Sequence, residues 1–183
     1  MRIVAGKHRG RRLATPGGRN VRPTSDRVRE ALFSILTQGT AVLPSDTRVL
    51  DAFAGSGALG LEALSRGAGF ASFMDSDRQS INLINQNLID LDEHSRATVL
   101  QRNATSPGQT DAPFDLVFLD PPYREGLAPL SLEALRQAGW VAPGARIVIE
   151  LSKKESIEVS EGYSLDTERT YGNTRIVILN ASA

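Results

Sequence analysis

The sequence DAFAGSGALG at residues 51–60 decides the fold. It follows a short apolar run and contains the pattern Gly55-x-Gly57-x-x-Gly60, which is typical of the turn between a buried strand and a helix in nucleotide-binding folds. Glycine at these positions permits a tight turn and a close approach of the backbone to a ligand. A glycine turn that serves only strand–helix packing is the alternative interpretation.

Outward from this turn, apolar strands alternate with amphipathic helices. We expect strands at 49–53, 70–74, 97–100, 114–119 and 146–151, and two closing strands near 163–169 and 174–179. Strands separated by helices predict an α/β fold, namely a doubly wound, mostly parallel sheet of Rossmann type with an antiparallel hairpin at its end. Ser25 is the expected N-cap of a helix before the first strand, and Ser76 with Gln79 has the spacing of a capping box.

Composition restricts the class of protein. The chain has 183 residues, of which 40% are hydrophobic and 23% charged, as in one globular domain of ordinary size. It has no cysteine and two distant histidines, so we expect neither a disulfide nor a metal site. No apolar run is long enough to span a membrane, and the first residues lack the apolar core of a secretory signal. We therefore expect a cytoplasmic protein that contacts no membrane.

The charge is distributed unevenly. Residues 1–29 hold nine Lys or Arg and only one acid, a net charge of +8, whereas residues 30–183 carry −8. This asymmetry predicts a basic hairpin extension over residues 1–22 that binds nucleic acid, followed by the main domain at 23–183; a plain solvated arm is the alternative. Removing residues 1–19 is then expected to leave cofactor affinity almost unchanged. The candidate phosphate-binding residues are Arg2, Lys7, Arg9, Arg11, Arg12 and Arg22.

Two carboxylates near the glycine turn could bind a nucleoside cofactor, and one of them, Asp51, together with the group at the end of the fourth strand, favours S-adenosylmethionine over NAD. Asp75 ends the second strand, where it can accept both hydroxyls of a ribose. Asp51 lies four residues before Gly55, where it would repel a pyrophosphate and would suit the cationic methionine end of S-adenosylmethionine. Asn103, after the third strand, is a candidate for an adenine edge. The candidate cofactor-binding residues are Asp51, Phe53, Ala54, Gly55, Ser56, Gly57, Asp75, Asn103, Ala104 and Asp120.

The sequence DPPY at residues 120–123 follows the fourth strand and predicts methylation of an amine on a nucleobase. Such an amine is a weak nucleophile because its lone pair is delocalised into the ring. The carboxylate of Asp120 and the carbonyl of Pro121 can each accept one of its N–H groups, and the two prolines hold these acceptors in place. Tyr123 offers a ring on which the base can stack. We expect Asp120, Pro121 and Tyr123 to be the catalytic residues.

Together these motifs resemble the RsmD-type methyltransferases. The most specific segments are RPTSDRVREALF at 22–33 and GLEALSRGA at 60–68, joined to the basic N-terminus and to the sequence DPPY. The resemblance implies a class I methyltransferase fold, and methylation of the N2 amine of one guanine in bacterial 16S ribosomal RNA within a partly assembled small subunit. It also implies a position for Thr24 beside the cofactor. The family more often has Glu at position 75, so Asp77 is the alternative ribose ligand.

Two other functions remain open from the residues alone. A DNA adenine-N6 or cytosine-N4 methyltransferase would use the same amine chemistry, although no segment is long enough for a domain that reads duplex grooves. A non-catalytic RNA-binding assembly factor would retain only the fold. Nothing in the sequence requires a dimer, so we expect a monomer.

Overall fold

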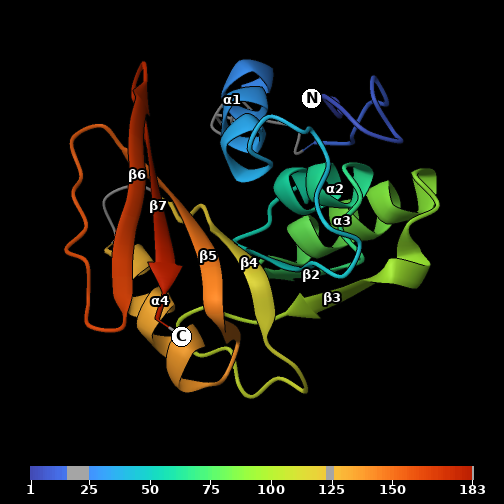
Figure 1. The fold of residues 1–183 in the computed structure, drawn as a ribbon. Coiled ribbons are helices and arrows are strands. Elements are labelled where there is room, and N and C mark those ends of the chain that lie inside the picture. The colour runs from blue at the N-terminus through green and yellow to red at the C-terminus, as the bar shows by residue number, and fades with distance from the viewer. Residues whose placement is uncertain (16–24, 123–125, 183) are drawn as a thin grey trace.

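The computed structural model describes residues 1–15, 25–122 and 126–182, and within them a seven-stranded sheet of order β3-β2-β1-β4-β5-β7-β6 (Figure 1). The strands are β1 (Arg48–Ala52), β2 (Phe70–Asp75), β3 (Ala97–Gln101), β4 (Phe114–Leu119), β5 (Val141–Ser152), β6 (Tyr163–Tyr171) and β7 (Thr174–Ala181). The first five are parallel, and β7 and β6 form the antiparallel edge. The predicted fold class is confirmed.

Helices cover both faces of the sheet (Figure 1). They are α1 (Asp26–Leu36), α2 (Ala58–Ser65), α3 (Arg78–Asp90), the short 3₁₀ helix η1 (His94–Arg96) and α4 (Leu127–Gln137). Helices α1, α2 and α3 share one hydrophobic core with the sheet, and α4 packs in the core on the other face. In the second core Trp140 stacks on Phe114, and its indole N–H donates to the carbonyl of Gly108 over 2.7 Å. No helix of the described residues is long and apolar enough to cross a membrane.

The N-cap residue predicted for α1 is confirmed, whereas the one predicted for α3 is wrong. Ser25 caps α1 and accepts a hydrogen bond from the backbone N–H of Val28, as predicted. The predicted capping box at Ser76 is wrong, because the N-cap of α3 is Asp77, whose carboxylate accepts from the N–H of Ser80 over 3.0 Å. Aspartate and serine are both good N-caps, so their spacing alone does not decide between neighbouring positions.

The first thirteen residues fold back on themselves and pack into the core. The N–H of Ile3 donates to the carbonyl of Arg11 over 2.9 Å, and Arg2 and Arg12 form one isolated antiparallel bridge instead of two strands. Ile3 and Leu13 are buried in the core beneath α1 and α2. The predicted boundary between residues 22 and 23 lies outside the described residues, so the division into two units stays a prediction.

A buried carboxylate on α2 holds this segment in place. Glu62 is fully buried, and its two oxygens accept the backbone N–H groups of Val4 and Ala5 over 2.8 and 3.0 Å. Its Oε1 also accepts from Nε of Arg66, which is itself buried. Glu62 is therefore a structural residue, and it satisfies backbone groups that would otherwise be buried without a partner.

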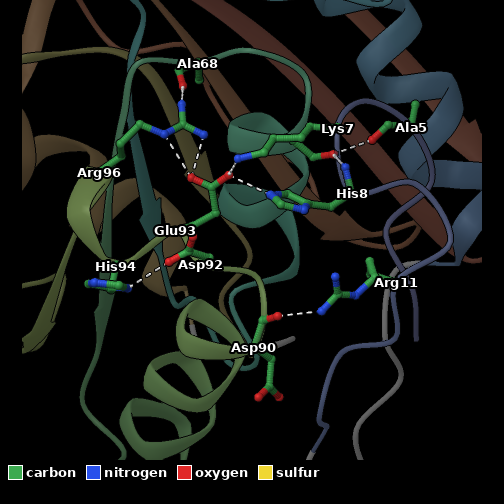
Figure 2. Close-up of polar contacts among 11 residues, drawn as sticks. Ala5, Lys7, His8, Arg11, Ala68, Asp90, Asp92, Glu93, His94 and Arg96 are labelled. Atoms are coloured by element: carbon green, nitrogen blue, oxygen red, sulfur yellow. Dashed lines mark hydrogen bonds and ion pairs between the residues drawn. The ribbon is translucent and has the colours of Figure 1, made fainter.

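The C-terminal end of α3 provides a second set of contacts to the segment (Figure 2). Nε2 of His8 lies 2.6 Å from Oε1 of Glu93, and Lys7 approaches the same oxygen to 3.5 Å. Burial raises the pKa of Glu93, but hydrogen bonds from His8 and Arg96 outweigh it and hold that pKa below its usual range. The guanidinium of Arg11 donates to the carbonyl of Asp90. The basic segment therefore contacts α2 through Val4 and Ala5, and it contacts the region around the end of α3 through His8 and Arg11.

Two glycines of the segment give a matched test of this docking. Gly6 and Gly10 have φ of +81° and +83°, but a Cβ on Gly6 would lie 1.9 Å from the backbone oxygen of Ser65, whereas one on Gly10 would meet nothing within 4 Å. Alanine costs about 1 kcal/mol at such a φ. We expect Gly6→Ala to destabilise the protein by roughly 2 kcal/mol more than Gly10→Ala does, because the backbone of α2 cannot yield. Urea unfolding of both variants measures this difference, and equal losses would argue against the docked segment.

Candidate active site

Four carboxylates lie at the C-terminal ends of adjacent parallel strands and share one face of the sheet. Asp51 in β1 is paired with Phe73 in β2 and with Phe118 in β4, and Phe118 is paired with Val148 in β5. Asp75, Asp120 and Glu150 lie two positions after Phe73, Phe118 and Val148, respectively. Since alternate residues of a strand point to the same face, all three acids share the face of Asp51 and form a row with it. The row consists of Asp75, Asp51, Asp120 and Glu150, from β2 to β5. It crosses the point between β1 and β4 where the strand order reverses, which is where open α/β sheets bind their ligands.

The glycine turn is held over this row by the carboxylates themselves. Oδ2 of Asp75 accepts the N–H of Gly55 over 2.8 Å, and Oδ2 of Asp51 accepts the N–H of Gly60 over the same distance. A Cβ on Gly60 would lie 2.4 Å from the ring of Phe73, so glycine is needed there for α2 to pack on β2. A Cβ on Gly55 would meet nothing within 4 Å, so that side of the turn faces open space. Gly60 is therefore required for packing, whereas Gly55 leaves room for a ligand.

Phe53 adds backbone strain beside the turn. It adopts φ of +64°, a left-handed conformation that is costly for an aromatic residue. Such strain persists where the surrounding structure enforces it, and it is concentrated at functional sites. This conformation is not predictable from the residue type, because phenylalanine is not among the residues that favour a positive φ.

Burial, together with neighbouring carboxylates, raises the pKa of two acids of the row, Asp51 and Asp120. Burial, together with the nearby charge of Asp75, raises the pKa of Asp51 to about 7, although its hydrogen bond from Gly60 opposes this rise. The pKa of Asp120 is raised well above its usual range by burial, then by the charge of Glu150 and, third, by that of Asp51. A group of acids that resist ionisation together favours a cationic ligand, which would relieve their repulsion.

The remaining predicted cofactor residues divide into three groups. Asp75 lies at the turn, where its two oxygens accept the backbone N–H groups of Gly55 and Asp77, whereas Asp77 caps α3 through its Oδ2. Ala54 is buried, and its N–H donates to the carbonyl of Met74, while Ala104 is buried in the core on the α4 side. Asn103 is exposed, and its side-chain oxygen accepts from the N–H and the hydroxyl of Thr105, which leaves only its amide N–H₂ for a ligand.

A cavity adjoins the start of the predicted catalytic loop. It has a volume of about 210 Å³ and extends from Pro121 and Pro122 to Glu150 and Ile157, beside the first turn of α4. It is smaller than the pockets of roughly 300–1,000 Å³ that hold drug-sized ligands, so its size suits a smaller molecule. Tyr123, Thr24 and Arg22 were predicted site residues, and all three lie outside the described residues.

The predicted phosphate-binding residues of the N-terminal segment differ in the contacts that their side chains make with the rest of the protein. Arg2 pairs with Asp26, Lys7 approaches Glu93 and Arg11 bonds the end of α3. Arg9 and Arg12 are exposed and form no ion pair with the acids of the described ranges. Among the predicted phosphate-binding residues that the structure describes, these two are the ones whose side chains form no ion pair or hydrogen bond with another described residue.

Two polar residues near the site were not predicted from the sequence. Glu150 is an acid within the apolar run of β5, and its place opposite Asp120 follows only from strand register. Asn87 is a polar residue on the buried face of α3, with 1% of its surface exposed, and it donates to the carbonyl of Ser56 in the glycine turn. In both cases the signal was a polar residue at an apolar position of its element.

A doubly wound sheet with an antiparallel edge, a glycine turn after β1 and acids at the ends of β1, β2 and β4 define a class I methyltransferase. Comparison with known proteins identifies the family. The sequence pattern of the family described as Conserved hypothetical protein 95 matches residues 1–180, and the chain belongs to this family, which confirms the RsmD-type resemblance.

Individual relatives agree with this assignment. The chain is 41% identical over 174 residues to Ribosomal RNA small subunit methyltransferase D of Escherichia coli K12, covering 94% of this chain and 85% of that protein. It is 37% identical over 176 residues to the protein of the same name from Haemophilus influenzae, covering 94% and 89%. A solved structure of the putative methyltransferase yhhF from Escherichia coli superposes with a TM-score of 0.87 at 39% identity, covering 100% of this chain and 98% of that one.

Proposed function

We propose that the protein, acting as a monomer, transfers a methyl group from S-adenosylmethionine to the exocyclic N2 amine of a guanine in 16S ribosomal RNA. Its substrate is the RNA within a partly assembled small ribosomal subunit. The row of carboxylates beneath the glycine turn carries this proposal, because it combines a site for a cationic nucleoside with an acceptor for an amine. The relatives named as ribosomal RNA small subunit methyltransferases support the choice of RNA.

The residues around the turn fit S-adenosylmethionine better than a dinucleotide. Asp75 would accept the ribose hydroxyls, since its Oδ2 already lies at the turn on the N–H of Gly55. Asp51 has one oxygen on the N–H of Gly60 and would direct its negative charge towards the ammonium of the methionine part. The pyrophosphate of a dinucleotide would meet these acids with like charge. Asn103 would use its amide N–H₂ at the adenine edge.

The chain's own residues would then prepare the amine for attack. When bound, S-adenosylmethionine supplies a methyl group on a positively charged sulfur, so little further activation of the donor is needed. Asp120 and the carbonyl of Pro121 would each accept one N–H of the amine and turn its lone pair towards the methyl group. The raised pKa of Asp120 makes it a better proton acceptor than an exposed carboxylate when the nitrogen becomes cationic. The cavity beside Pro121 would hold the flipped guanine, with Tyr123 as the stacking ring.

The proposed RNA surface is the exposed side of the N-terminal segment. Arg9 and Arg12 would bind phosphates, which position the RNA without reading its sequence. Arg2, Lys7 and Arg11 retain charge near this surface, but each also contacts the body of the protein. The guanine would be selected at the cavity and not by the basic segment.

Mapping of ribosomal RNA by mass spectrometry tests the proposal. Cells that lack the protein are expected to lose one N2-methylguanine from 16S ribosomal RNA, and the purified protein is expected to restore it with labelled S-adenosylmethionine. Small subunits, free 16S RNA and duplex DNA should be compared as acceptors. Transfer to DNA alone, or an unchanged methylation map, would overturn the proposed substrate.

Cofactor affinity is expected to depend on pH through Asp51. Its pKa of about 7 means that the carboxylate becomes protonated below neutrality and no longer attracts a cation. The affinity for S-adenosylmethionine should therefore fall by about tenfold from about pH 8 to about pH 6. Asp51→Asn keeps an oxygen for the N–H of Gly60, and it should bind more weakly with a flat pH profile. Titration calorimetry measures both, and an unchanged profile in the variant would show that another group titrates.

A further inference from the structure

Asn87 joins the N-terminal segment to the glycine turn through a single side chain. Its Oδ1 accepts the N–H of Ala14 over 2.7 Å, and its Nδ2 donates to the carbonyl of Ala14 over 3.1 Å. The same Nδ2 donates to the carbonyl of Ser56 over 2.9 Å. Ser56 stands between the two glycines of the turn, so one amide contacts both the segment and the proposed cofactor site.

The chemistry of these three bonds requires a primary amide. An asparagine side chain has one acceptor oxygen and an N–H₂ group with two donors. The N–H of Ala14 fixes the oxygen, so both hydrogens of Nδ2 are directed at carbonyls, one in the segment and one in the turn. A carboxylate of the same shape would place an oxygen against two carbonyl oxygens. An apolar side chain would leave the three backbone groups without this partner in a place where Asn87 is 1% exposed.

The two ends of this connection lie next to the two proposed ligands. Ala14 follows Arg12 by two residues, and Arg12 and Arg9 are exposed cations of the segment that form no ion pair with an acid of the described ranges. The segment also contacts α3, the helix that carries Asn87, through Arg11 at Asp90, and it contacts Glu93 just beyond the end of that helix through His8 (Figure 2). At its other end α3 begins at Asp77, two residues after the proposed ribose ligand Asp75.

We propose that Asn87 is a positioning residue that couples RNA binding at the N-terminal segment to cofactor binding at the glycine turn. This inference rests on the proposed function for the identity of the two ligands. Each ligand would restrict the motion of a group that is bonded to Asn87. The second ligand to bind would then lose less conformational entropy, and its affinity would be higher. Because such coupling is reciprocal, RNA raises cofactor affinity by the same factor by which the cofactor raises RNA affinity. With this coupling, removal of residues 1–19 is expected to weaken cofactor affinity, in contrast to the effect that the charge pattern alone predicts.

The test compares Asn87→Asp with Asn85→Asp. Asn85 lies on the exposed side of the same helix, and within the described part of the chain its side chain donates to the carbonyl of Ile81 alone, so the control makes the same chemical change away from the connection. Equilibrium dialysis of labelled S-adenosylhomocysteine, which cannot react, gives its affinity with and without unmethylated small ribosomal subunits. The subunits should raise this affinity about fivefold or more in the wild type and in Asn85→Asp, and should leave it unchanged in Asn87→Asp. Retained coupling in Asn87→Asp, or bound subunits that do not change wild-type affinity, would overturn the proposal.

A second measurement needs neither RNA nor a variant. In the wild-type protein, S-adenosylhomocysteine is expected to slow hydrogen exchange at the amide of Ala14, although that amide lies in another segment of the chain. Unchanged exchange with the ligand bound would overturn the coupling even if Asn87→Asp does not fold. A wild-type protein that shows this slowing but binds no ribosomal subunit would instead refute the proposed RNA substrate and leave the connection through Asn87 standing.

Discussion

Asp120→Asn is expected to slow methyl transfer on the order of a thousandfold while the protein still binds S-adenosylmethionine within a few-fold of wild type. The asparagine removes the charged acceptor that orients the amine, and its own N–H₂ can face that amine with like polarity. Correct positioning and proton acceptance together account for losses of this size. Single-turnover transfer to small ribosomal subunits measures the chemical step, and calorimetry measures cofactor binding separately.

The same variant is expected to be more stable than the wild type at about pH 8. Folding raises the pKa of Asp120, so the folded state binds the proton more tightly than the unfolded chain does. This stabilising effect is present at low pH and is lost as the pH rises through the folded-state pKa. An asparagine removes the penalty, and the Tm should rise even though activity falls. Higher stability with lower activity is typical of a residue kept for function.

Asp115→Asn is the matched control, on β4, the strand that Asp120 directly follows. Asp115 is exposed and accepts the backbone N–H of Arg48 over 2.8 Å, which asparagine can also do. Its variant should match the wild type in rate and in Tm. If Asp120→Asn transfers methyl groups as fast as Asp115→Asn, Asp120 does not orient the amine.

The fold was largely predictable because its signals are local. Apolar strands, the glycine turn and the N-cap at Ser25 depend on residues close together in the chain, and the predicted β4 agrees with the structure at both ends. The acids at the ends of β1, β2 and β4 were also predictable, since parallel strands bring these ends to one edge. Glu150 was not, because its position beside Asp120 depends on the register between two strands.

The structure of the N-terminal segment was less predictable, because the residues that hold it in place are distant from it in the sequence. Its basic composition predicts phosphate binding, but it contains no local pattern that predicts the burial of the two apolar residues Ile3 and Leu13 in the core. Its hydrogen-bond partners Glu62 and Asn87 lie 57 to 73 positions further along the chain. A local pattern reports the charge of such a segment but not the surface on which it packs.

Glu62→Ala tests that packing and is expected to cost about 3–5 kcal/mol of folding stability. The substitution leaves the buried guanidinium of Arg66 without its carboxylate, and it leaves the N–H groups of Val4 and Ala5 without acceptors. Arg66 stays over the ring of Phe33, at 4.8 Å from the ring centroid, so its charge remains confined in the core. The loss is a large part of the roughly 5–15 kcal/mol by which a typical domain is stable.

Glu133→Ala provides the comparison on the surface. Glu133 also forms an ion pair within its helix, with Arg136, but both side chains are exposed and water replaces the lost partner. Its variant should unfold at nearly the same urea concentration as the wild type. In Glu62→Ala, hydrogen exchange at Val4 and Ala5 should also rise ahead of global unfolding, because the segment loses the carboxylate to which it is bonded. A small effect of Glu62→Ala, equal to that of Glu133→Ala, would mean that the segment is not fixed to α2.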